Sequence, residues 1–459
     1  MEDSLQYMCG FGSHVSTEAI PNALPKGQNS PQEAPFGLYA EQLSGTAFTA
    51  ARHRNLRSWL YRIRPSVIHT DFTGPLDHTG GIPTSINDDF VITPNQLRWS
   101  PLELDTTKDK RVDFVDGMSS VAGAGDPSLK EGCCIFNYLC NQDMTHTDGK
   151  GGRVMCNADG DLLIVPQQGS LRISTEFGKL HVKPCEIVVI PRGIKFAVNL
   201  DLDNLDGDSF EFARGYLLEV YQGHFELPSL GPIGANGLAN PRDFQIPVAF
   251  YEDLDVDVNF SIVQKYMGKL FTATLNHSPF DVVAWHGNYY PFKYDLDNFC
   301  TMNSVSFDHP DPSIFTVLTV PTDEPGVAVA DFVIFPKRWM VANKTFRPPY
   351  YHRNTMSEYM GMIHGHYDAK AGGFVPGGAS LHSCMSPHGP DATTYEKASQ
   401  AELKPQYFDG GLAFMFESCY MLKVSPKALE SPSKQTDYQD CWQGIKKHFK
   451  PPLPPTTCA

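Results

Sequence analysis

Residues 157–199 read NADGDLLIVPQQGSLRISTEFGKLHVKPCEIVVIPRGIKFAVN. Gly and Pro interrupt this stretch about every eight to twelve residues, which is typical of short strands joined by turns. Between the interruptions, apolar residues alternate with polar ones, as at Leu171 and Ile173, Leu180 and Val182, and Ile187 and Val189. The stretch therefore predicts an antiparallel meander or barrel and indicates a mainly β protein.

The end of this stretch resembles the second metal-binding motif of the cupin family. Glu186, the turn Pro191-Arg-Gly193 and Phe196 have the spacing of that motif. Cupins usually carry a metal-binding His where this chain has Phe196, and a phenyl ring cannot bind a metal ion. We therefore expect a metal-free, cupin-like unit over about residues 121–230 that serves as scaffold.

The rest of the chain extends the β-rich pattern on both sides. Dense punctuation by Pro, Gly and Asn in the first 120 or so residues predicts an irregular N-terminal extension of short strands and long loops. Residues 231–280 are interpreted as a connector, in which FSIVQKYMGKLFTATLN could hold one helix. A second β-rich block runs from about 280 to about 423, and the tail beyond it has one predicted short helix around CWQGIKKHFK.

These patterns predict a mainly β protein with two cupin-like β-sandwich or barrel units. Its 459 residues are enough for two or three compact units, and its 38 Gly and 36 Pro favour turns over long helices. We assign residues 1–280 to an N-terminal β-rich domain that includes the metal-free unit and the connector. Residues 281–459 form the predicted C-terminal catalytic domain with its tail.

Charge and cysteine content exclude several classes of partner and site. A formal net charge of −15 without a long block of Lys or Arg argues against nucleic acid or an anionic membrane as partner. No stretch approaches the roughly 20 apolar residues that cross a bilayer, and the amino end lacks signal-peptide features, so we expect a cytoplasmic protein. The eleven scattered Cys residues, without a CxxC pair, are interpreted as reduced thiols.

A candidate metal site lies in the C-terminal block. The run from Tyr350 to Glu358 keeps the order of the first cupin motif, with His352 and Glu358 as ligands and Asn354 where many cupins have a second His. About thirty residues later, SLHSCMSPHGPD offers His382 and His388, and spacing alone does not choose between them. Two His and one carboxylate occupy one face of an octahedral iron(II) and leave three positions open, unlike a closed zinc site.

Long segments of the chain are similar to the homogentisate 1,2-dioxygenase family, and the resemblance covers nearly the whole chain. Among them are PNQLRW, VVAWHGNYYPFKY, ADFVIFPKRWMVANKTFRPPYYHRN and SLHSCMSPHGPDA. The resemblance implies an enzyme that uses Fe(II) and O₂ to open the ring of homogentisate to maleylacetoacetate in the breakdown of tyrosine and phenylalanine. It also implies a homo-oligomer, commonly a hexamer built as a dimer of trimers.

The resemblance carries over residue by residue. It implies iron ligands at His352, Glu358 and His388, and a general base at His309. A neutral imidazole is suited to accept the phenolic proton that the substrate must lose. Tyr367, His382 and His388 are implied to contact substrate, and Arg347 or Arg353 are weaker candidates for its acetate group.

Two other classes of function stay open at this point. The first is a different cupin enzyme, such as a gentisate-type dioxygenase or a zinc isomerase. The second is a non-catalytic storage or ligand-binding protein with two cupin units. Metal content separates the storage protein and the isomerase from an iron enzyme, and oxygen uptake with homogentisate or gentisate separates the dioxygenases.

Overall fold

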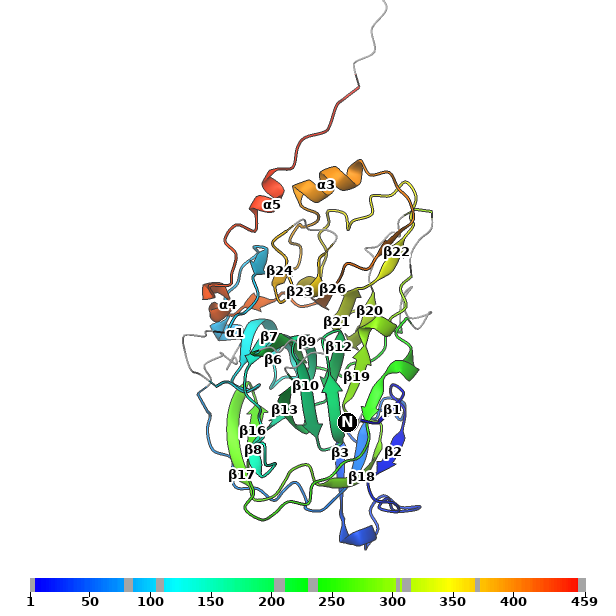
Figure 1. The fold of residues 1–459 in the computed structure, drawn as a ribbon, viewed down its shortest axis with the longest axis vertical. Coiled ribbons are helices and arrows are strands. Elements are labelled where there is room, and N and C mark those ends of the chain that lie inside the picture. The colour runs from blue at the N-terminus through cyan, green and yellow to red at the C-terminus, as the bar shows by residue number, and fades with distance from the viewer. Residues whose placement is uncertain are drawn as a thin grey trace, which may run out of the picture.

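The computed structural model describes residues 5–77, 86–104, 111–201, 211–229, 238–302, 306–307, 315–367 and 372–452. Over these residues the protein consists mainly of strands packed as layered sheets, with a few short helices, of which α3 (Ala392–Ser399) and α5 (Asp440–Gln443) lie at one end (Figure 1). The predicted mainly β class is therefore confirmed. Each described sheet has two edge strands, so the units are packed open sheets and not closed barrels.

The largest sheet has nine strands and forms the middle layer of the molecule. In spatial order they are β1 (Tyr7–Cys9), β15 (Gln245–Pro247), β19 (Phe292–Asp295), β12 (Glu186–Ile190), β9 (Asp161–Gln168), β14 (Ala213–Val220), β7 (Glu131–Cys140), β6 (Met118–Asp126) and β27 (Lys423–Val424).

A second sheet of six strands shares a hydrophobic core with the first. Its order is β11 (Gly178–Val182), β10 (Ser170–Thr175), β13 (Lys195–Asp201), β8 (Gly151–Asn157), β16 (Asn259–Tyr266) and β17 (Lys269–Leu275). The strands predicted within residues 157–199 are thus present, but they are divided between two sheets, β9 and β12 in the first and β10, β11 and β13 in the second, and do not form one meander. Phe196 is fully buried between the sheets, with its ring edge-on to Phe114.

The helix expected in FSIVQKYMGKLFTATLN was wrong, because this segment forms the β16–β17 hairpin. Tyr266 pairs with Lys269 across a two-residue turn, and both turn residues, Met267 and Gly268, have positive φ, 51° and 73°. Two consecutive positive φ angles are the geometry of the tight turn that matches strand twist. Gly at the second turn position was the local signal for a hairpin.

Smaller elements complete the N-terminal half. A four-stranded sheet has the order β2 (Val15–Glu18), β18 (Val282–Gly287), β4 (Arg57–Arg62) and β3 (Tyr39–Ser44). The division at residue 280 stays a prediction, and β18 and β19, which follow it, pair with strands of the N-terminal half. The short helices here are η1 (Pro35–Gly37), α1 (Ile86–Asp89), η2 (Pro241–Asp243) and η3 (Leu296–Asn298).

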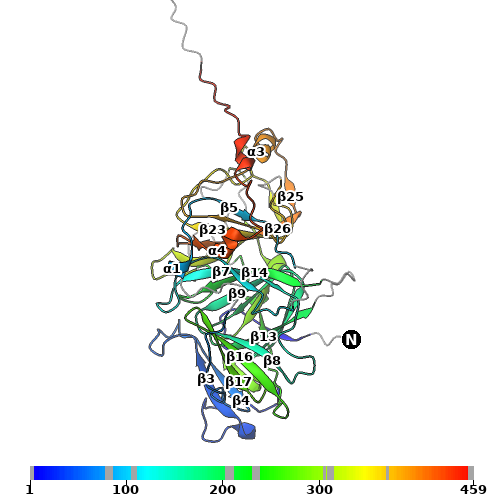
Figure 2. The same ribbon diagram turned by 90° about the vertical axis from the view of Figure 1, so that its left-hand side faces the viewer.

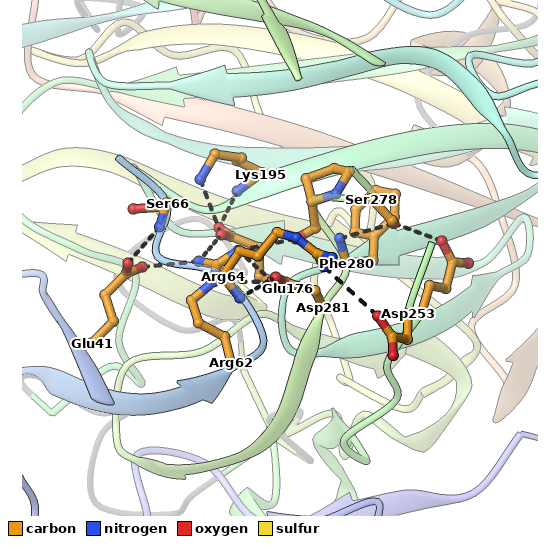
Figure 3. Close-up of polar contacts among 12 residues, drawn as sticks. Glu41, Arg62, Arg64, Ser66, Glu176, Lys195, Asp253, Ser278, Phe280 and Asp281 are labelled. Carbon is orange, nitrogen blue, oxygen red and sulfur yellow. Dashed lines mark hydrogen bonds and ion pairs between the residues drawn. The ribbon is translucent and has the colours of Figure 1, made fainter. Parts of the chain in front are cut away.

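A cluster of buried charges ties this small sheet to the six-stranded one (Figure 3). Arg62, on β4, is 1% exposed, and its guanidinium contacts Glu176 at 2.8 Å and Asp281 at 2.8 Å. Glu41 contacts the same guanidinium at 2.9 Å, and Lys195 contacts Glu176 at 3.1 Å. Burial by itself would raise the pKa of Glu176, but Lys195 and Arg62 outweigh it and lower the pKa.

The C-terminal half is built on another six-stranded sheet. Its order is β20 (Thr316–Pro321), β21 (Ala328–Phe335), β26 (Gly411–Ser418), β23 (Ser357–Gly365), β24 (Ala379–His382) and β5 (Leu97–Trp99). The remaining elements are the pair β22 (Arg338–Met340) and β25 (Gln406–Phe408), and the helices α3 (Ala392–Ser399), α4 (Pro426–Glu430) and α5 (Asp440–Gln443). No helix in the described ranges has the length and apolar character to cross a membrane.

One face of this C-terminal sheet packs on the nine-stranded sheet and the other faces away from it (Figure 2). Tyr359, on β23, points to the packed face, where its hydroxyl bonds Asn137 of β7 at 2.8 Å. Because side chains alternate along a strand, Glu358 and Met360 point to the opposite face. That face carries the functional site.

Candidate metal centre

Two loops and one strand bring His352, Glu358 and His388 together. Glu358 is the second residue of β23, while His352 lies in the loop before that strand and His388 in the loop after β24. The two loops pair through their backbones: the N–H of His352 donates to the carbonyl of His388 at 2.9 Å, and the reverse bond is 3.0 Å. One ligand atom from each of the three residues lies within 4.8 Å of the others.

Hydrogen bonds to backbone carbonyls orient both imidazole rings. Nδ1 of His352 bonds the carbonyl of Tyr350 at 2.7 Å, and Nδ1 of His388 bonds the carbonyl of Ser386 at 2.9 Å. Since a carbonyl can only accept, each Nδ1 carries the proton and Nε2 is the nitrogen available to a metal. Both Nε2 atoms face the carboxylate of Glu358, at 3.6 Å from His352 and 2.9 Å from His388.

The carboxylate of Glu358 is buried and ionised. Asn354 donates from Nδ2 to its Oε1 at 2.7 Å, which fixes the plane of the carboxyl group. Burial would raise the pKa of Glu358, but the close contacts of its oxygens with the imidazoles of His352 and His388 outweigh it and lower the pKa strongly. The donor set of two imidazole nitrogens and one carboxylate oxygen therefore fits a divalent metal ion with open positions.

Further acidic residues extend from Glu358 across the sheet. In the strand register, Glu358 lies opposite Glu417 of β26, and Glu417 lies opposite Asp331 of β21. Residues directly opposite have Cβ atoms about 5 Å apart. Burial, then the charges of Glu358 and Asp331, raise the pKa of Glu417 to about 8, and burial raises the pKa of Asp331 to about 6.

The acidic row was missed in the sequence, although a signal was present. Asp331 and Glu417 are the acidic residues within the strand-like runs VAVADFVIFP and GLAFMFES, which are otherwise mostly apolar. An acid in such a run is rarely buried without a partner, so its position indicates a functional or paired role. Only the register shows that both acids lie in line with Glu358.

Comparisons with known proteins show the family of this chain. The family model described as homogentisate 1,2-dioxygenase N-terminal matches residues 6–296, and the C-terminal model matches residues 297–449. The curated homogentisate 1,2-dioxygenase of Homo sapiens is 56% identical over 451 residues, covering 97% of this chain and 97% of that protein. The Caenorhabditis elegans protein of the same name is 55% identical, covering 98% of this chain and 99% of that protein.

This chain belongs to the homogentisate 1,2-dioxygenase family. A curated homogentisate 1,2-dioxygenase from Oryza sativa subsp. japonica is also 55% identical, over 96% of this chain and 92% of that protein. The two family models together match both the N-terminal half and the residues of the metal centre. Membership in this family, together with the His352–Glu358–His388 group, implies a bound metal.

The sequence left open whether His382 or His388 completes the metal site, and the geometry distinguishes them. His388 contributes Nε2 to the three-residue group, and His382 does not belong to it. The ring of His382 instead lies flat against that of His388, with centroids 4.2 Å apart and planes 9° apart. Nε2 of His382 bonds the hydroxyl of Tyr438 at 2.7 Å, so this nitrogen has a protein partner.

The other predicted site residues are placed as follows. Tyr367 follows β23 and packs edge-on against Phe335 and Phe374, beside a buried cluster on the same sheet face as Glu358. The buried members of that cluster are Val333, Met360, Met362, Phe374, Ala413 and Met415. Apolar side chains therefore line the sheet from the metal centre toward Tyr367.

The two arginines proposed for the acetate group differ in their surroundings. Arg347 is committed to backbone carbonyls, those of Ala342 at 3.2 Å and Lys404 at 2.6 Å, which indicates a structural role. Arg353 is exposed. His309, predicted as the general base, lies outside the described residues.

Proposed function

We propose that the protein is an Fe(II)-dependent dioxygenase that converts homogentisate and O₂ to maleylacetoacetate in tyrosine and phenylalanine breakdown. The observation that carries this proposal is a facial group of two imidazoles and one carboxylate in a chain of this family. The atoms balance, because both oxygen atoms of O₂ enter the product and no separate reductant is needed. Ferrous iron, when bound, supplies adjacent positions for the substrate oxygens and O₂ and a path for electrons between them.

The residues of the chain then have separate tasks. His352, Glu358 and His388 hold the iron, and Asn354 keeps the carboxylate of Glu358 in one orientation. The apolar side chains that continue from Glu358 along the sheet, Met360 and Met415 among them, form a surface suited to the face of an aromatic ring.

Proton transfer and substrate orientation fall to residues implied by the family. We propose that His309 accepts the phenolic proton of homogentisate and that the Tyr367 hydroxyl contacts the substrate. We also propose that His382 and His388, whose rings are stacked, contact the substrate. Holding the ring beside O₂ in a fixed orientation is itself a large part of the rate enhancement in such reactions.

We further propose a cytoplasmic homo-oligomer, a hexamer arranged as a dimer of trimers. Large apolar side chains stand exposed in the N-terminal part, including Phe36 at 66%, Phe48 at 76% and Val67 at 75%. Exposed apolar groups of this size are typical of surfaces that associate. Sedimentation analysis of the purified protein tests this assembly, and a monomer would contradict it.

Oxygen consumption by anaerobically iron-loaded protein tests the proposed reaction. We expect equimolar use of homogentisate and O₂, slow or absent uptake with gentisate, and no turnover when zinc replaces iron. Uptake with gentisate in preference to homogentisate would favour a gentisate-type dioxygenase. Bound zinc together with no oxygen uptake on either substrate would favour an isomerase, and failure to bind metal would favour a storage protein.

His309→Ala tests the general base separately from the metal. We expect the variant to retain iron and to turn over about 10²–10⁴-fold more slowly, the usual loss for a general base. The matched control is His53→Ala, which removes an exposed histidine of the N-terminal part and should leave turnover unchanged. Turnover of the His309 variant at the parent rate would remove His309 from the mechanism.

A further inference from the structure

The loop that carries His388 is held from outside by two segments that are remote in sequence. Gln96, next to β5, donates from Nε2 to the carbonyl of Pro387 at 2.6 Å. Trp442, in α5, donates from its indole Nε1 to the carbonyl of Gly389 at 3.3 Å. These bonds fall on the residues immediately before and after His388. Gln439 then joins the two segments, since its Nε2 donates to Oε1 of Gln96 at 2.7 Å.

Tyr438, just before α5, is the member of this arrangement that reaches the site itself. It is 3% exposed, and its hydroxyl shares a 2.7 Å hydrogen bond with Nε2 of His382. The guanidinium of Arg98, on β5, lies over its ring at 4.3 Å from the centroid, and the ring of Trp442 packs against it at 5.1 Å. The phenol is therefore held by contacts with its ring and with its hydroxyl.

His382 transmits this constraint to His388. Its ring is parallel to that of His388 at 4.2 Å, and the ring of His352 packs on His388 at the same centroid distance, with planes at 62°. A parallel ring at that distance blocks rotation of its neighbour, because the rotating edge would meet the stacked face. The plane of the His388 imidazole thus depends on where His382 is held.

We propose that Tyr438 is a positioning residue of the metal centre, acting through His382 to fix the imidazole of His388. The hydroxyl of Tyr438 also hydrogen-bonds Nε2 of His382 and so keeps this nitrogen directed away from the metal site. This inference rests on the proposed metal site. It extends that site to residues 438–442, which contribute none of the three ligands.

The expected size of the effect follows from how such outer partners act in metal sites. Loss of a group that orients a ligating histidine typically lowers metal affinity about 10–100-fold. Tyr438 acts through one intervening ring, so we expect Tyr438→Phe to weaken Fe(II) binding about tenfold. The phenyl ring would keep the packing with Arg98 and Trp442, and the fold should persist.

A double-mutant cycle on the full-length chain tests the proposal. Fe(II) affinity is measured by anaerobic titration of metal-free protein for the parent, Tyr438→Phe, His382→Phe and the double variant. Bound Co(II) provides a spectroscopic signature of the ligand geometry in the same proteins. His382→Phe keeps a flat ring but removes the nitrogen that Tyr438 holds, so Tyr438→Phe should add little in that background.

The matched control is Tyr290→Phe in the N-terminal half. Tyr290 is also 3% exposed, and its hydroxyl donates to the carbonyl of Ser13 at 2.7 Å, so the variant loses an equally short, equally buried bond. We expect it to lower the melting temperature as much as Tyr438→Phe does, without changing Fe(II) affinity or the Co(II) spectrum.

The outcomes separate this inference from the proposed function. A positioning role is supported if Tyr438→Phe binds Fe(II) more weakly than the parent and alters the Co(II) spectrum. The double variant should then differ little from His382→Phe in both measurements. Parent-like affinity in Tyr438→Phe, additive losses in the cycle, or an equal loss in Tyr290→Phe would each overturn it. A parent protein that binds no Fe(II) would instead contradict the metal centre itself.

Discussion

Each half of the molecule holds a group of acidic side chains away from solvent, and the two groups differ in the cations beside them. Around Arg62, each carboxylate lies within 3.1 Å of an Arg or Lys nitrogen. Around Glu358, the neighbouring acids are Glu417 and Asp331, and no Lys or Arg of the described residues forms an ion pair with any of the three. A buried acid without a cationic partner resists ionisation, and the pKa values of Glu417 and Asp331 are accordingly raised, to about 8 and about 6. The first group is complete within the chain, and the second is suited to a metal cation.

Glu358→Gln should give the largest effect on metal content and turnover, because it changes the acidic group that lacks an Arg or Lys partner. The amide removes the anionic ligand, so we expect loss of stoichiometric metal and of turnover, with little change in the melting temperature of the metal-free protein. His388→Ala should behave alike. Elemental analysis after gel filtration measures the metal, and Glu402→Gln, an exposed position, is the control. Full metal content and activity in either ligand variant would contradict the assignment.

Arg62→Met should have the next largest effect, a loss of stability, because it changes the group in which Arg and Lys already pair with the acids. Removing this guanidinium leaves Glu176 and Asp281 buried beside a single remaining cation, Lys195, and breaking such a group costs about 3–5 kcal/mol. We expect a large fall in stability in a denaturant or thermal melt, with metal affinity unchanged in the protein that remains folded.

Arg64→Met is the matched control for this variant. Arg64 is 23% exposed and pairs with the half-exposed Asp255, so its loss should cost less than about 1 kcal/mol. Equal losses in the two variants would show that burial of the Arg62 group does not set its contribution. A loss of metal affinity in Arg62→Met would show that the two groups are coupled.

Asp331→Asn should give the smallest effect and a pH-dependent one. The folded state raises the pKa of Asp331 from 3.8 to about 6, so folding favours its protonated form. The cost to stability is absent below about pH 4, develops as the pH rises toward 6, and is constant above it. The metal-free variant should therefore be more stable than the parent at pH 7, by about 1–3 kcal/mol, and equal to it near pH 4.

Melting curves of both proteins from pH 4 to 8 measure this difference. Asp253→Asn, at an exposed carboxylate, should follow the parent at every pH. A constant difference in stability between the Asp331 variant and the parent across this pH range would contradict the prediction. It would mean that folding does not change the pKa of Asp331.

Much of the fold could be predicted because its signals are local. Alternating apolar residues and regular turns predicted the strands of residues 157–199, and the β-rich block predicted from about 280 to about 423 contains β20, β21, β23 and β26. The β16–β17 segment was harder, because its mixed apolar pattern fits either a helix or a hairpin and only the Gly268 turn distinguishes them. Sheet membership was not predictable, since strands that follow one another in the sequence are divided between two sheets.

The sequence by itself determined the β-rich class, the first-motif order of His352 and Glu358, and, through family resemblance, the choice of His388. Only the tertiary structure decided that Asp331, Glu417 and Glu358 share one row, that Asn354 holds the carboxylate, and that Tyr438 reaches His382. Strand register and ring orientation depend on pairing between segments far apart in the chain. Local spacing carries the identity of the donors, whereas long-range packing sets the directions in which they point.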